Sequence, residues 1–143
     1  MAFKIFLDVN VFVDFFDPNR PDNVAATKAF SLIENKKVIA FISESVICTT
    51  LYLISKQNDS ESLKALTKGI LTNFEILPCS NFLFLQSLNL DFDDIEDAVI
   101  YNLAMQNKMD YFITNDKEAL KKLGNKKLPI ITTKDFLLLM NVL

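Results

Sequence analysis

The sequence predicts an α/β fold in three layers, with a parallel sheet of about five strands flanked by helices. Two observations favour this class. Short apolar runs alternate with longer segments of helical composition along the whole chain of 143 residues. These runs are continuous rather than alternating in polarity, which is typical of strands that are buried on both faces. Because half of the residues are hydrophobic, one core of good size can form, and we expect residues 1–143 to be a single domain.

The five predicted strands are short apolar segments bounded by polar residues, Pro or Asn. Pro78 ends the third of them, since proline cannot donate a hydrogen bond to a neighbouring strand. The runs are Phe3–Leu7, Val38–Ile42, Phe74–Leu77, Tyr111–Thr114 and Pro129–Thr132.

Helices are predicted between the strands from apolar spacing and capping residues. Asp22 can cap a helix that runs to about Asn35, and Ser60 can cap one that runs to about Leu71. A short helix over Asp116–Leu123 would be closed by Gly124. Further helices are expected over 44–56, 81–88 and 134–141, and from the acidic stretch 91–97 to about 107. The remaining segments are an apolar one over 9–16 and a loop over 17–21.

Several residue types are rare or missing, and their absence excludes whole classes of enzyme. The chain has no His, which removes Ser-His-Asp and Cys-His catalysis and any histidine-bound metal. With 2 Gly, it has neither a P-loop nor a dinucleotide-binding turn. Cys48 and Cys79 stand alone, so we expect reduced, buried and inert thiols in a cytosolic protein.

Charge and hydropathy bear on the location and the partners. No apolar stretch approaches the roughly 20 residues that span a bilayer, and Met1–Leu7 is too short for a signal core, so we expect a soluble, cytoplasmic protein. The net charge of −3 is unusual for a nucleic-acid binder. However, lysines cluster after Asp116, either as a solvated face or as a phosphate-contacting patch. They are Lys117, Lys121, Lys122, Lys126 and Lys127.

Four aspartates occupy positions that suit one metal site. Asp8 follows the first strand, Asp116 follows the fourth, and Asp97 lies on a helical segment between them with Asp94 one turn earlier. In an open α/β sheet, ligands bind beyond the carboxyl ends of the strands. Because crowded carboxylates repel one another, a divalent cation is their natural partner. The simpler alternative is that Asp8 and Asp116 cap helices, while Asp94 and Asp97 complement a helix dipole.

Two other phospho-chemistries also use an Asp after the first strand. A haloacid dehalogenase-type phosphatase needs a second Asp two residues later, where this chain has Asn10, which cannot carry a proton. A phospho-acceptor receiver domain expects paired acids at that strand end and a late Lys at another, and neither is clearly present. A metal-dependent phosphatase that acts on small phosphate esters stays open as an alternative.

Three motifs in order resemble the PIN domain family of metal-dependent nucleases. They are Asp8-Val9-Asn10 after the first strand, Asp94-Ile95-Glu96-Asp97-Ala98 at a helix start, and Ile113-Thr114-Asn115-Asp116 at the fourth strand end. Their order and spacing fit, as does the overall length, so the resemblance covers essentially the whole chain. It implies a PIN-like three-layer sandwich.

The resemblance also implies an activity and partners. Asp8, Asp97 and Asp116 would be catalytic and would hold Mg²⁺ or Mn²⁺ with support from Asp94, for hydrolysis of RNA phosphodiester bonds. The hydroxyls of Ser43 and Thr114 could donate hydrogen bonds to the phosphate. Small members of the family are often VapC-like toxins of bacterial toxin–antitoxin pairs, which implies a small antitoxin partner and a homodimer.

The chain departs from the family at one position. Many PIN domains carry a Glu on the helix after the second strand, and that position falls near Thr49, so the chain resembles the branch that lacks this Glu. Glu44 either substitutes or only decorates a helix N-terminus, which we favour. A degenerate PIN domain that binds RNA or protein without cleavage therefore stays open. We expect Asp14 to be structural, and Asn10 either orients a carboxylate or binds backbone.

Overall fold

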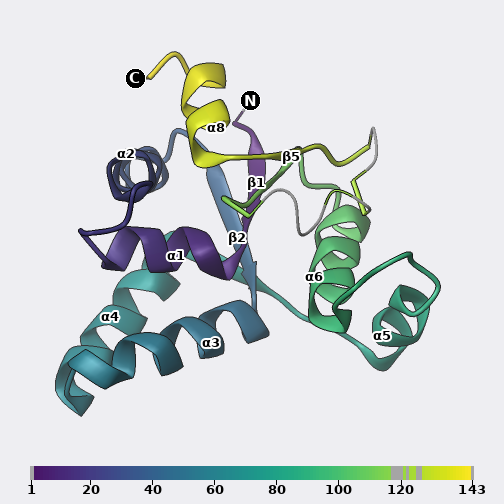
Figure 1. The fold of residues 1–143 in the computed structure, drawn as a ribbon, viewed down its shortest axis with the longest axis horizontal. Coiled ribbons are helices and arrows are strands. Elements are labelled where there is room, and N and C mark those ends of the chain that lie inside the picture. Colours follow the sequence, from purple (N-terminus) through teal and green to yellow (C-terminus); the bar gives the residue numbers. More distant parts are fainter. Residues whose placement is uncertain (1, 117–120, 122, 125–126, 143) are drawn as a thin grey trace.

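The computed structural model describes residues 2–116, 121, 123–124 and 127–142, and it confirms the predicted parallel sheet (Figure 1). Every pair of neighbouring strands is parallel, in the order β3-β2-β1-β4-β5. Each strand overlaps its predicted run. The bounds are β1 Lys4–Leu7, β2 Ile39–Ser43, β3 Phe74–Leu77, β4 Tyr111–Ile113 and β5 Ile130–Ile131.

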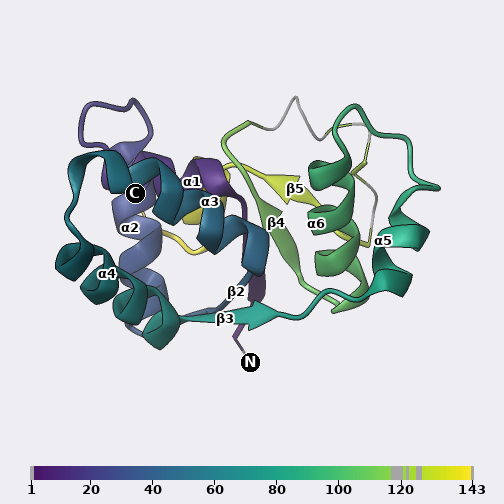
Figure 2. The same ribbon diagram turned by 90° about the horizontal axis from the view of Figure 1, so that it is seen from below.

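Helices cover both faces of the sheet and complete three layers. Helices α1 to α4 lie on one face, and α5 and α6 lie on the other (Figure 2). Helix α8 packs against α2. The bounds are α1 Val9–Phe16, α2 Asn23–Glu34, α3 Glu44–Ile54, α4 Ser60–Asn73, α5 Asn81–Ser87, α6 Ile95–Gln106 and α8 Thr133–Leu139, with a 3₁₀ turn at Ser55–Gln57.

The handedness of the connections explains this division. From β1 the chain moves outward to β2 and β3, then returns to the other side of β1 to form β4 and β5. Because crossovers between parallel strands are right-handed, reversing the direction moves the connecting helices to the opposite face. The reversal places a topological switch point between β1 and β4, where ligands bind in folds of this kind.

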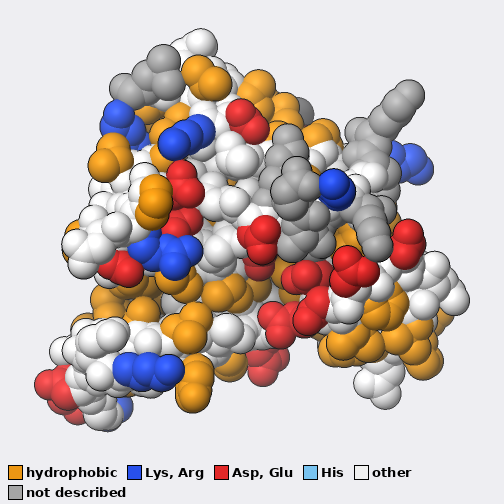
Figure 3. Space-filling model, in the orientation of Figure 1, with side chains coloured by type: hydrophobic (Ala, Val, Ile, Leu, Met, Phe, Trp, Pro, Cys, Tyr) orange, Lys and Arg blue, Asp and Glu red, His pale blue; other side chains and the backbone are white. Residues whose placement is uncertain are grey.

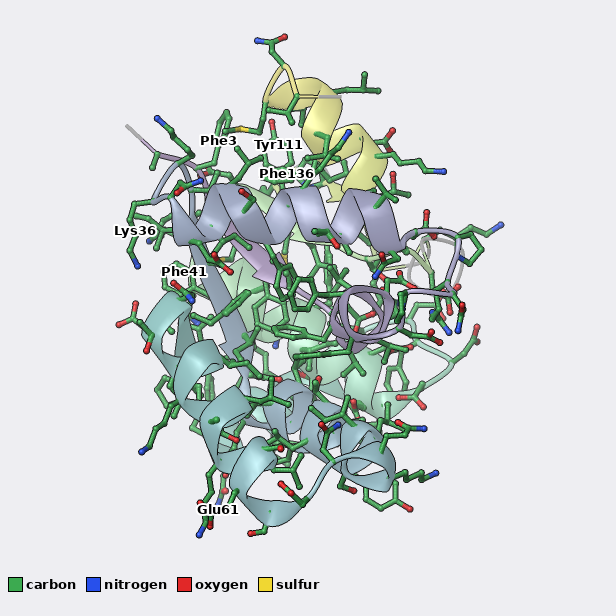
Figure 4. All side chains as sticks on the ribbon, turned by 90° about the vertical axis from the view of Figure 1, so that its left-hand side faces the viewer. Phe3, Lys36, Phe41, Glu61, Tyr111 and Phe136 are labelled. Carbon is green, nitrogen blue, oxygen red and sulfur yellow. The ribbon has the colours of Figure 1, made fainter. Side chains whose placement is uncertain are left out.

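Much of the core is phenylalanine. Phe6 and Phe112 stack across β1 and β4 at 5.3 Å between ring centroids, and Phe12 meets Phe30 edge-on at 5.2 Å on the other face of the sheet. The first contact joins β1 to β4, and the second joins α1 to α2. At the opposite edge of the sheet, Phe3 and Tyr111 lie side by side at 5.4 Å (Figure 4).

Two capping predictions need correction. Helix α4 is capped by Asp59, whose Oδ1 accepts from the Ser62 amide at 2.8 Å, and Ser60 is its first residue. Asp22 precedes α2 as predicted, but it caps no amide within the described chain. Its carboxylate lies 3.7 Å from Lys134 Nζ instead. The Asp59 contact is local to the start of its helix, whereas the Asp22 contact comes from the packing of α8 against α2.

Three further expectations differ in outcome. The apolar segment after Asp8, which the sequence left unassigned, is helix α1. The thiols of Cys48 and Cys79 are free, but both are exposed, so the prediction that they are buried was wrong. They line a groove between the start of α3 and the α5–α6 face.

The predicted helix over 116–123 and part of the lysine cluster lie outside the described residues. No helix in the described part of the chain is long and apolar enough to cross a membrane.

Candidate metal centre

Strands β1 and β4 bring the first and last acidic motifs together. Leu7 pairs with Ile113, and the amide of Asp8 donates to the Ile113 carbonyl at 3.0 Å. The segments that follow β1 and β4 therefore leave the sheet side by side at its carboxyl edge, on either side of the switch point. Asp8 and Asp116, which are more than 100 positions apart in sequence, become neighbours in this way.

Asp8 is half-buried and strongly held. Its Oδ1 accepts from the Val9 amide at 2.7 Å, so it caps α1. Its Oδ2 accepts from Thr114 Oγ1 at 3.0 Å and from Asn10 Nδ2 at 3.3 Å. Burial raises the pKa of Asp8 above its ordinary value, the bonds from Val9 and Thr114 oppose that rise, and the charge of Asp116 adds to it. The helix-cap role and the proposed ligand role are compatible, because an oxygen that accepts one hydrogen bond has a further lone pair.

The remaining acids come from the first turn of α6. Helices that connect parallel strands run antiparallel to them, so the N-terminus of α6 lies at the carboxyl edge of the sheet. Asp94 caps this helix, and its Oδ1 accepts from the Asp97 amide at 3.2 Å. The cap fixes the backbone of both residues at the edge where Asp8 and Asp116 lie.

The four predicted acids act on one another, and we call them the acidic cluster: Asp8, Asp94, Asp97 and Asp116. Asp97 reports this most directly, because its pKa is raised to about 6. Burial is the largest cause, followed by the negative charges of Asp8, Asp94, Glu96 and Asp116. Figure 3 shows acidic side chains gathered in a band on this face.

Glu96 was missed as a site residue by the sequence reasoning. Its pKa is also raised, by burial first and then by the charges of Asp94 and Asp8. The signal available in the sequence was its position beside Asp97 on the same helical turn. Glu44, by contrast, is exposed in the first turn of α3, and Thr49 is half-buried with no acidic group.

The chemistry of the cluster fits a hard divalent cation. The charges of described residues that raise the pKa of Asp97 are all negative, so a cation would relieve the repulsion. Among the described residues, no three acidic side chains are already arranged to enclose an ion. Mg²⁺ usually keeps several waters and binds through one or two carboxylates, which this open arrangement suits.

The two hydroxyls that were expected to contact phosphate have other roles. Thr114 is fully buried and donates to Asp8, and its Oγ1 accepts from Asn10 Nδ2 at 2.8 Å. Ser43 is buried, and its Oγ accepts from the Val46 amide at 3.1 Å as the cap of α3. The expectation of direct phosphate contacts from these two residues is therefore not supported. Asn10 was expected either to orient a carboxylate or to bind backbone, and it does both. Its Nδ2 donates to Asp8, and its Oδ1 accepts a hydrogen bond from the backbone amide of Asn115 at 2.9 Å.

The protein is thus a three-layer α/β domain that carries a carboxylate cluster at the switch point of its parallel sheet. The model of the PIN domain family matches residues 4–118, and the chain belongs to this family. Within the family it is VapC-like. It is 27% identical over 138 residues to Ribonuclease VapC1 of Aquifex aeolicus (strain VF5), covering 93% of this chain and 92% of that protein.

Solved structures agree with the fold. The chain is similar to a toxin–antitoxin complex from Klebsiella pneumoniae, with a TM-score of 0.64 and 19% identity over 90% of this chain and 97% of that one. It is also similar to VapC20 of Mycobacterium tuberculosis, a sarcin-ricin loop cleaving toxin, with a TM-score of 0.64 and 14% identity. There the match covers 82% of this chain and 93% of that one. The PIN-like sandwich predicted from the sequence is thus confirmed.

Proposed function

We propose that this protein is a divalent-metal-dependent endoribonuclease and the toxin of a bacterial toxin–antitoxin pair, acting in the cytoplasm. The observation that carries the proposal is the shared negative field of the acidic cluster at the switch point of the sheet. The similarity to a ribonuclease over nearly the full length supports RNA as the substrate. The likeness of fold to a sarcin-ricin loop cleaving toxin, matched over 93% of that chain, supports the toxin role.

In this proposal Asp8, Asp97 and Asp116 hold Mg²⁺ or Mn²⁺, and Asp94 supports them. The bound ion would activate water for attack on phosphorus and neutralise the charge that develops on the leaving oxygen. The contribution of the protein is geometric, because Thr114 and Asn10 keep Asp8 turned toward the cluster. Asp97 is partly protonated near pH 6 in the metal-free protein, so binding of a cation would favour its ionised form.

The test is cleavage of a mixed RNA pool with Mn²⁺, with Mg²⁺ or with EDTA. Asp8→Asn, Asp97→Asn and Asp116→Asn should each lower the metal-dependent rate by about 100-fold or more, because each removes a charge that meets the ion. Glu61→Gln is the matched control, since Glu61 is an exposed acid in the first turn of α4 that pairs with Lys64 (Figure 4). It should cut like the wild type.

Two results would redirect the proposal. If no RNA is cut with either metal, or if the cluster variants cut as fast as the wild type, the chain is better treated as an RNA- or protein-binding PIN domain. Hydrolysis of a small ester such as p-nitrophenyl phosphate without RNA cleavage would favour the phosphatase alternative.

We also propose a small antitoxin and a second copy of this chain as partners. A similar structure contains a toxin with its antitoxin, which supports the first. The stretch 76–90 carries no charged residue, and α5 exposes Phe82, Phe84 and Leu85, which supports an apolar interface (Figure 3). Light scattering should give twice 16.3 kDa, and coexpression with a short protein encoded beside this gene should give a complex in which RNA cleavage is inhibited.

A further inference from the structure

A set of polar side chains behind the acidic cluster joins three elements that are distant in sequence. Asn115, two residues after β4, lies at its centre and is half-buried. Its Nδ2 donates to Asp14 Oδ2 on α1 at 2.6 Å. Its Oδ1 accepts from both the amide and the hydroxyl of Thr133, at the start of α8, at 3.0 and 2.9 Å. The amide group of this one side chain therefore connects α1, the β4 end and α8.

The far end of this set is an ion pair between a buried carboxylate, Asp14, and a more exposed guanidinium, Arg20. Asp14 is 2% exposed, and its Oδ1 accepts from Arg20 Nε at 2.6 Å. Arg20 belongs to the loop between α1 and α2, and it reaches inward past the end of α1. A carboxylate buried to this degree is held only when its oxygens are paired, and here Arg20 takes one oxygen and Asn115 takes the other. Asp14 is thus fixed in place, and Asn115 with it.

The near end of the set reaches the acidic cluster. The backbone amide of Asn115 donates to Asn10 Oδ1 at 2.9 Å, and Asn10 Nδ2 donates to Asp8 and to Thr114. The amide of Asp116 donates to Thr114 Oγ1 at 3.1 Å. The directions are consistent, because the Thr114 hydroxyl gives its one proton to Asp8 and accepts from the other two groups. Asp8 and Asp116 are thus tied to the same hydrogen-bonded frame.

We propose that Asn115 is a positioning residue for the nuclease centre, anchored by the Asp14–Arg20 pair. It holds the backbone between Thr114 and Asp116 so that the carboxylates of Asp8 and Asp116 face one ion. The inference rests on the proposed metal-dependent function. Only an amide serves at this position, because Asp14 requires a donor while Thr133 requires an acceptor.

The pairing of an amide with a carboxylate permits an exchange experiment. Asn115→Asp sets two carboxylates against each other, and Asp14→Asn leaves only one acceptor oxygen for the donors on Arg20 and Asn115. In the double variant the two groups trade places. The amide at position 14 donates to the carboxylate at position 115, and that carboxylate still accepts from Thr133. A role in positioning predicts that each single change harms the centre and that the double change restores it.

The measurements are Mn²⁺ affinity by calorimetry and the kcat and KM for RNA cleavage, with the full-length protein at 25 °C. Each single variant should bind Mn²⁺ about 10–100-fold more weakly and lose a similar factor in kcat, because partners that orient metal ligands have effects of this size. KM should change much less. The double variant should recover to within about fivefold of the wild type. Ser87→Ala is the control, since it removes a buried hydroxyl on α5 that accepts from Asn102 at 3.0 Å. It should lower Tm and leave Mn²⁺ affinity unchanged.

The outcomes separate this inference from the proposed function. If the wild type neither binds Mn²⁺ nor cuts RNA, the proposed function fails, and the positioning role falls with it. If the wild type binds Mn²⁺ and Asn115→Asp binds it equally well, only the positioning role is overturned. Should the single variants fail to fold, Asn115→Ala removes the side-chain bonds to both Asp14 and Thr133 without setting two carboxylates against each other. An unchanged Mn²⁺ affinity and kcat in that variant would also overturn the role.

Discussion

The two sides of the acidic cluster are built differently. On the strand side, Asp8 accepts hydrogen bonds from Val9, Asn10 and Thr114 and is locked by the frame behind it. On the helix side, Asp97 accepts no side-chain hydrogen bond from the described residues, and four negative charges act on it. The fold therefore prepares one carboxylate in advance and holds the other against repulsion. A cation would gain most from the helix side, because repulsion there is relieved only when the ion arrives.

The largest expected effect comes from a substitution that removes the ion pair behind the strand side of the cluster. Arg20→Ala removes the ion partner of Asp14 and should lower the free energy of unfolding by about 3 kcal/mol, the upper end for a buried acceptor that loses its donor, because the Asp14 carboxylate is charged and buried although Arg20 itself is 42% exposed. Urea denaturation measures this loss. Lys134→Ala is the control, because its 3.7 Å pair with Asp22 is exposed, and it should change stability by about 0.5 kcal/mol or less. Equal effects of the two changes would mean that the frame is not rigidly held.

The second prediction concerns the helix side of the cluster and the thermal stability that a bound cation adds there. Mn²⁺ at 100 times its Kd should stabilise the wild type by about 2.7 kcal/mol. For a chain of this size that raises Tm by roughly 5–10 °C. Asp97→Asn should remove most of the shift, while Glu61→Gln should keep it. Thermal melts with Mn²⁺ or EDTA make the comparison, and a wild-type Tm that ignores Mn²⁺ would count against a metal centre.

The smallest effect concerns Asp97 in the metal-free protein. Its folded pKa of about 6 lies above the ordinary value of 3.8, so the folded state binds the proton more tightly than the unfolded state does. Stability is then highest when Asp97 is protonated and falls as the pH rises through about 6. Asp97→Asn should stabilise the protein at pH 8 by about 1 kcal/mol or less, because water screens a half-exposed carboxylate. Urea unfolding in EDTA at pH 5 and pH 8 tests the sign, and the gain should shrink at pH 5.

The positions of the strands and of the strand-end acids could be predicted because the signals are local. A continuous apolar run followed by Asp marks a buried strand that ends at a polar edge, as at Leu7 and Asp8. Helix α1 was not recognised, since its apolar residues include three valines and its cap is the candidate ligand itself. Burial of Cys48 was misjudged, because residue type gives only an average exposure, whereas the groove beside α3 depends on packing.

The sequence by itself determined the fold class and the order of the elements, and it singled out the carboxylates that we propose for the centre. Apolar periodicity and the succession of motifs act over a few residues, so they can be read directly along the chain. Only the tertiary structure decided how those carboxylates are held. The bond from Thr114 to Asp8 spans 106 positions, and the bond from Asn115 to Asp14 spans 101. Such contacts exist because β1 and β4 pair across the switch point, and no local pattern specifies which polar groups then meet.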